Sequence, residues 1–104
     1  MSGSNKRNRY GNPPVDACST LTFDATVNSP QPGVLATLKV GDALNVVSTH
    51  AGQGAAVSHQ GNVVGALTGT RVAQLINCMN SGFTYSATVK TLSGGQCIVR
   101  IDPL

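Results

Sequence analysis

The chain has 104 residues, enough for one domain built around one hydrophobic core. It contains no Trp and only four other aromatic residues, so its core must consist mainly of aliphatic side chains. No apolar run approaches the roughly 18 residues of a transmembrane helix, and no apolar segment follows the first charges as it would in a signal peptide. We therefore expect a soluble, cytoplasmic protein.

The net charge of +3 comes from the beginning of the chain. Lys6, Arg7 and Arg9 lie there, whereas the other four basic residues equal the four acids in number. Residues 1–14 offer almost nothing to bury, so we expect a flexible basic tail followed by a single domain over residues 15–104. The tail is either a solubilising extension or an arm that contacts phosphates or an acidic partner.

The domain begins with a predicted strand and a helical turn. Residues 15–27 alternate in places between apolar and polar side chains, which is typical of a strand. Its apolar face comprises Leu21, Phe23, Ala25 and Val27. The apolar residues that follow Pro32 predict a short helical turn at about residues 33–38, because proline is favoured in the first turn of a helix.

Three short strands are predicted in the middle of the chain, over residues 43–48, 55–58 and 63–67. His59–Asn62 is expected to form the turn between the second and the third. Gly65 lies inside a strand, which indicates a bulge or a close approach of two backbones.

The clearest helix covers residues 70–81. Its apolar stripe comprises Val72, Leu75, Ile76 and Met79, at spacings of three and four residues. Thr70 or Thr68 is the expected N-cap, and Gly82 stands where a helix end favours a left-handed residue.

A last hairpin completes the predicted fold. Residues 83–90 alternate again, and Ser93–Gln96 contains the Gly-Gly pair that tight hairpin turns favour. The last strand is expected to comprise Cys97, Val99 and either Ile101 or Ile98. These elements predict a mainly β (α+β) fold, a small barrel of five or six strands with the helix plugging one end.

The order of these pieces resembles HIRAN domains over roughly residues 34–101. The matching segments are Leu38–Leu44, Ala56-Val57, Gly61–Leu67, Leu75-Ile76, Gly82 and Tyr85–Val89. The loop His50–Gly54 lacks the Asn and Asp that the family typically carries before its short Ala-x-Val strand. HIRAN domains are small barrels that bind the 3′ end of single-stranded DNA, so the resemblance implies binding of DNA ends.

The cysteines and histidines give no sign of catalysis or metal binding. Three widely spaced cysteines argue against a disulfide framework, although a single pair such as Cys18 with Cys97 stays open. A zinc site drawn from the cysteines and one histidine lacks the C-x-x-C spacing of such sites. His50 and His59 are read as exposed loop residues with no nucleophile beside them. We expect no enzyme, no cofactor and no metal.

One stretch offers chemistry for recognising an anion. Thr68, Gly69, Thr70 and Arg71 combine hydroxyls and a cation with the free amides of a helix start, a set suited to a phosphate or a carboxylate. The alternative interpretation is helix capping beside an exposed arginine.

Two functions follow from the sequence. The first is noncatalytic binding of single-stranded DNA, in which the basic tail and Arg71 contact phosphates, and Tyr10 or Tyr85 stacks on bases. The second is a protein-interaction module or accessory subunit, which binds a partner or a second copy through its strand edges.

Overall fold

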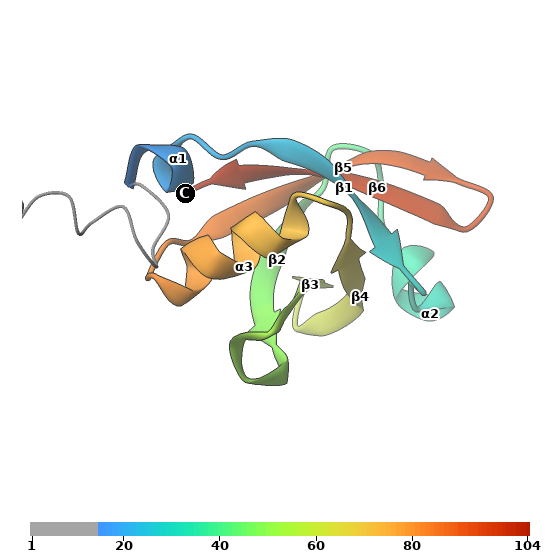
Figure 1. The fold of residues 1–104 in the computed structure, drawn as a ribbon. Coiled ribbons are helices and arrows are strands. Elements are labelled where there is room, and N and C mark those ends of the chain that lie inside the picture. Colours follow the sequence, from blue (N-terminus) through green and yellow to red (C-terminus); the bar gives the residue numbers. More distant parts are fainter. Residues whose placement is uncertain (1–14) are drawn as a thin grey trace, which may run out of the picture.

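The computed structural model describes residues 15–104 (Figure 1). The elements of this range are α1 (Val15–Ser19), β1 (Phe23–Asn28), α2 (Pro32–Leu35), β2 (Ala43–Thr49), the 3-10 helix η2 (His50–Gly52), β3 (Gly54–His59), β4 (Asn62–Thr68), α3 (Val72–Asn80), β5 (Tyr85–Ser93) and β6 (Gln96–Pro103). The predicted basic tail, residues 1–14, lies outside the described residues.

The six strands form one antiparallel sheet that closes in a ring, in the order β1-β4-β3-β2-β5-β6. Strand β1 closes the ring because it pairs with two neighbours. Phe23 lies opposite Ile101 of β6, and Thr26 lies opposite both Ile98 of β6 and Thr68 of β4. The predicted mainly β barrel is therefore confirmed, with six strands.

The beginning of the domain differs from the prediction. Residues 15–19 form the helix α1, and the strand starts only at Phe23. The apolar positions Val15 and Cys18 are three residues apart, which is a helical spacing, and the strict two-residue alternation begins at Leu21. From there the prediction is correct, because Leu21, Phe23, Ala25 and Val27 are all buried.

The core is aliphatic, as the composition requires. The strands and the helices α1 and α3 together contribute the largest fully buried side chains, which are Leu75, Ile101, Val57, Val64, Val89, Val99 and the three cysteines. The predicted turn at about 33–38 corresponds to α2, which has Pro32 at its start. None of the helices in the described part of the chain is long and apolar enough to span a membrane.

Gly65 lies where two backbones approach closely. A Cβ atom at this position would lie 2.8 Å from the Asn28 carbonyl oxygen and 2.7 Å from a methyl of Val27. The pairing of β3 with β4 shifts register beside it, between Val57 and Ser58. Both parts of the sequence interpretation, a bulge and a close approach, are confirmed.

Helix α3 ends as predicted. Gly82 has a φ of 101° and donates its amide to the Met79 carbonyl, while the Phe83 amide donates to the Cys78 carbonyl. These two bonds are those of a Schellman motif, which satisfies carbonyls at the helix end. The helix spans Val72–Asn80, inside the predicted range of 70–81.

The predicted turns of the two hairpins are also present. Gln60 and Gly61 have φ angles of 53° and 85°, and Gly94 and Gly95 have φ angles of 57° and 83°. Two successive positive φ angles are typical of the tight turns that match the twist of paired strands. The β5–β6 hairpin ends in the second of these turns (Figure 1).

Candidate functional site

The start of α3 is not capped by a side chain, contrary to the prediction for Thr68 or Thr70. The Thr68 hydroxyl instead donates to the Thr26 carbonyl at 3.2 Å, which fastens the end of β4 to β1. The position before the helix is occupied by Arg71, whose backbone is already helical. An N-cap residue has an extended backbone, and its side-chain oxygen accepts a hydrogen bond from an amide of the first turn. Arg71 has neither this backbone conformation nor such an oxygen.

Free amides therefore remain at this helix start. The Val72 amide donates to the Gly69 carbonyl, and the Leu75 amide donates to the Arg71 carbonyl. Between them, the amides of Ala73 and Gln74 have no acceptor among residues 15–104. Such amides, together with the positive end of the helix dipole, favour an anion.

Arg71, which comes just before these amides in the chain, lies over an aromatic ring. Its guanidinium carbon lies 5.6 Å from the centre of the Phe23 ring, which is a cation–π distance. Phe23 is only 8% exposed and belongs to the core, whereas Arg71 is exposed. The ring therefore gives Arg71 a fixed support and leaves its donors accessible.

The four adjacent candidates from the sequence thus lie together on the surface. Thr68, Gly69, Thr70 and Arg71 are all exposed at the junction of β4 and α3. The Thr68 hydroxyl is engaged as a donor to the backbone, so the free amides and Arg71 are the groups that remain to bind an anion.

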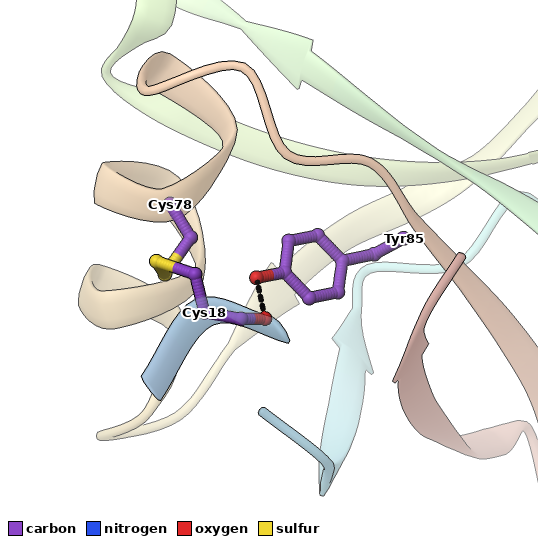
Figure 2. Close-up of a disulfide and its surroundings, with 3 residues drawn as sticks. All are labelled: Cys18, Cys78 and Tyr85. Carbon is purple, nitrogen blue, oxygen red and sulfur yellow. Dashed lines mark hydrogen bonds between the residues drawn. A yellow bond between two sulfur atoms is a disulfide. The ribbon is translucent and has the colours of Figure 1, made fainter. Parts of the chain in front are cut away.

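Tyr85 lies elsewhere, inside the domain. It is 3% exposed, and its hydroxyl donates to the Cys18 carbonyl at 2.6 Å (Figure 2). Burial raises the pKa of this hydroxyl above its ordinary value of 10.0. A ring in this position is not accessible to a base, so we leave Tyr85 out of the candidate site. Lys6, Arg7, Arg9 and Tyr10 lie outside the described residues.

The cysteines contradict the sequence interpretation. Cys18 of α1 and Cys78 of α3 form a disulfide, and their Cα atoms are 5.5 Å apart (Figure 2). Cys97 is the free cysteine, so the alternative of a Cys18–Cys97 pair is wrong. Burial raises the pKa of the Cys97 thiol. The residues described contain no cluster of three or more metal-ligating side chains.

The disulfide bears on the predicted cytoplasmic location. Disulfides persist mainly in oxidising environments and are rare in the cytosol. The Cys18–Cys78 bond therefore argues against the cytosol as the place where the domain folds.

Sequence reasoning missed two contacts at this end of the molecule, namely the disulfide and the Arg71–Phe23 pair. The burial of Cys78 had a signal, because it lies three residues after Leu75 on the buried side of α3. No signal indicated that Cys18 is its partner, since the connectivity of cysteines cannot be deduced from one sequence.

Comparison with known proteins gave no relative: no family model, no curated protein and no solved structure matches the chain.

Proposed function

We propose that this barrel is a noncatalytic binding domain for single-stranded DNA, and that the start of α3 holds a phosphate. The observation that carries the proposal is the uncapped first turn of α3 beside Arg71. Two free amides and one fixed guanidinium are the donors that phosphate oxygens accept.

Two features of the sequence support the same proposal. The resemblance to HIRAN domains implies a DNA-end-binding barrel. The basic residues Lys6, Arg7 and Arg9 supply positive charge that the rest of the chain does not have in excess. In the proposed complex they neutralise backbone phosphates, while Arg71 and the α3 amides fix one of them. Tyr10 is the remaining aromatic candidate for stacking on a base.

The test is fluorescence anisotropy with a short, labelled single-stranded DNA at several salt concentrations. If all four cations contact phosphates, log Kobs falls with log[salt] with a slope of about −3. Arg71→Ala is expected to weaken binding and to reduce the magnitude of this slope by about 0.7, because one phosphate contact is lost.

The matched control is Arg100→Ala. Arg100 is also an exposed arginine of the barrel, but it lies on β6 and pairs with Asp24 at 3.5 Å. Its loss is expected to leave the affinity and the slope nearly unchanged. Equal effects of the two variants would show that only net charge matters, and no binding at about 100 μM protein would reject the proposal.

A second candidate function is a protein-interaction module, and the edge of β2 favours it. Asn45 pairs with both β3 and β5, but within the described chain residues 46–49 have strand partners only in β3. An open strand edge of this kind accepts an added strand from a partner or a second copy. Pull-down from the native host with and without nuclease distinguishes the two functions, because a protein partner that survives nuclease treatment supports the second.

A further inference from the structure

We propose that the bound DNA strand runs along the exposed side of α3, from Arg71 at the start of the helix to His50 at the tip of the β2–β3 hairpin, and that protonated His50 binds a second phosphate. This path rests on the proposed function. It adds to that function a direction for the bound strand and a dependence of its affinity on pH.

The tip of the β2–β3 hairpin lies against the last residue of α3. The Asn80 side chain donates from Nδ2 to the Gly52 carbonyl at 2.9 Å. A Cβ atom at Gly52 would lie 2.9 Å from Oδ1 of the same side chain, so Asn80 also packs against the backbone of the tip. Arg71 and the hairpin tip are therefore at opposite ends of one helix, about 13 Å apart along its axis, since each residue rises about 1.5 Å.

His50 has a fixed place in this tip. Its backbone is left-handed, with a φ of 53°, and so is that of Ala51, with a φ of 55°. Its ring nitrogen Nδ1 lies 3.1 Å from the Thr49 hydroxyl oxygen, and a Cβ atom at Gly54 would lie 3.2 Å from the same nitrogen. The ring is thus held against the hairpin, while Nε2 has no partner among residues 15–104. Because His50 is exposed, this second nitrogen is available to a ligand.

The exposed side of α3 connects the two ends. Ala73, Asn77 and Asn80 are spaced by four and three residues and are all exposed, so they form one row along the helix. Ala73 has a free amide at the start of this row, and Asn80 contacts the hairpin at its end. Between them, the Asn77 side chain has no partner in the described part of the chain, so its amide is available to a phosphate or a base.

No negative charge in the chain segment that forms this path opposes a phosphate. Residues 43–101, which include the hairpin and α3, contain no acid. The groups around His50 are the Thr49 hydroxyl, the backbone of Gly54 and, from α3, the Asn80 amide, and all of them are uncharged. Histidine is the side chain that gains a positive charge as the pH falls from 8 to 5. A proton on His50 therefore adds a cation at the far end of the path, with no carboxylate from this segment to neutralise it.

The test is fluorescence anisotropy with a labelled oligothymidylate of about 12 nucleotides, at about pH 7.5 and about pH 5.5. Thymine does not titrate between these values, so only the protein changes. At about 50 mM salt the affinity of the native protein is expected to rise by about fivefold or more at the lower pH, because one more phosphate is neutralised. The magnitude of the salt slope should rise by about 0.7 for the same reason.

His50→Asn should bind as the native protein does at the higher pH and lose the gain at the lower one. Asparagine tolerates a left-handed backbone, so this variant removes the charge and retains the turn. The matched control is His59→Asn. His59 is the last residue of β3, whereas the hairpin tip precedes the first, so this variant should keep the full gain.

A second pair of variants tests the path between the two ends. Asn77→Asp places a negative charge in the middle of the exposed row and should weaken binding at both pH values by about fivefold or more. Asn62→Asp makes the same chemical change at an exposed residue beside His59, and it should have a much smaller effect. Far-UV circular dichroism of all four variants checks that they are folded.

Three outcomes would overturn the path. An affinity that does not rise at the lower pH, or that rises equally in His50→Asn, would show that His50 binds no phosphate. Equal losses in Asn77→Asp and Asn62→Asp would show that the strand does not follow α3. If the oligothymidylate bound at neither pH, the proposed function would fail together with the path, whereas binding without these dependences would reject the path alone.

Discussion

Two helices of about one turn each, α1 and α2, lie on different sides of the barrel and are held in different ways (Figure 1). Helix α1 is joined to the core by a disulfide and by the buried hydroxyl of Tyr85. Helix α2 has no fully buried residue, and most of its hydrogen bonds are local.

The bonds of α2 are made almost entirely within its own sequence. The amides of Leu35, Ala36, Thr37 and Leu38 donate to carbonyls three or four residues earlier. One bond reaches the barrel, from the Gln31 amide to the Val64 carbonyl at 2.8 Å. The comparison teaches that a short helix can be held over the core in two ways. Helix α1 depends on long-range bonds, whereas α2 combines local hydrogen bonds with the packing of Val34 and Leu35 against the core.

The largest expected effect concerns the α1 side. The disulfide closes a loop of 60 residues, and removing it is expected to cost about 4 kcal/mol of unfolding free energy, because the unfolded chain regains that freedom. Urea denaturation of the oxidised protein and of the Cys18→Ser, Cys78→Ser variant measures the difference. Cys97→Ala is the control that keeps the disulfide. A loss below about 1 kcal/mol would contradict the role assigned to this bond.

The next effect concerns the α2 side, at Gly65. The Cβ of Gly65→Ala would meet the backbone of Asn28 at 2.8 Å and of Pro30 at 3.2 Å. These atoms belong to the turn that leads into α2, so the variant is expected to push the turn away from β4 at a cost of about 2–3 kcal/mol. Gly33→Ala is the matched control, because a Cβ there meets nothing within 4 Å. If Gly65→Ala and Gly33→Ala unfolded at the same urea concentration, the turn would move away from the added methyl group without a measurable loss of unfolding free energy.

These two sides also differ in how far the sequence predicted them. On the α2 side, Pro32 and the apolar residues after it act through nearby chain. Gly65 meets the distant Asn28 and Pro30, but a glycine inside a strand indicates a close approach by itself. All three were predicted. The α1 side depends on contacts over 60 residues, and there the strand predicted for 15–19 and the unpaired cysteines were wrong. Patterns of two and four residues report local structure, and they contain no information on which distant residue is a partner.

The candidate site shows the same division. The exposure of Thr68–Arg71 at a helix start followed from the apolar stripe of α3, which fixes where the helix begins. The support of Arg71 by Phe23 joins residues 48 apart in the chain, and only the closed barrel brings them together.

A smaller effect on the α1 side is expected from Tyr85→Phe. The variant removes the hydroxyl that donates to the Cys18 carbonyl at 2.6 Å and leaves this carbonyl only the longer bond from the Leu21 amide at 3.5 Å, so we expect a cost of about 1–2 kcal/mol. Thermal unfolding at neutral pH compares the two proteins. An unchanged midpoint would indicate that water replaces the hydroxyl.

The difference in stability between the native protein and Tyr85→Phe is expected to depend on pH, because the Tyr85 hydroxyl titrates. Because burial raises the pKa of Tyr85 in the folded state above its ordinary value of 10.0, the unfolded state loses the proton first as the pH rises. The stability that Tyr85 contributes is therefore fully present below pH 10 and declines above it. The gap between the native protein and Tyr85→Phe should narrow from pH 9 to pH 11. A constant gap would contradict the raised pKa.

The smallest effect is expected on the α2 side, at Thr37. Its hydroxyl donates to the Val34 carbonyl at 2.7 Å. The backbone amide of Thr37 donates a second hydrogen bond to the same carbonyl. Thr37 is exposed, so water replaces the hydroxyl when it is removed, and Thr37→Ala is expected to cost about 0.5 kcal/mol or less. Urea denaturation beside Tyr85→Phe provides the measurement. Because both variants remove one hydroxyl that donates to a backbone carbonyl, a larger loss for Thr37→Ala would reverse the comparison. It would mean that α2, not α1, contributes the less replaceable contacts.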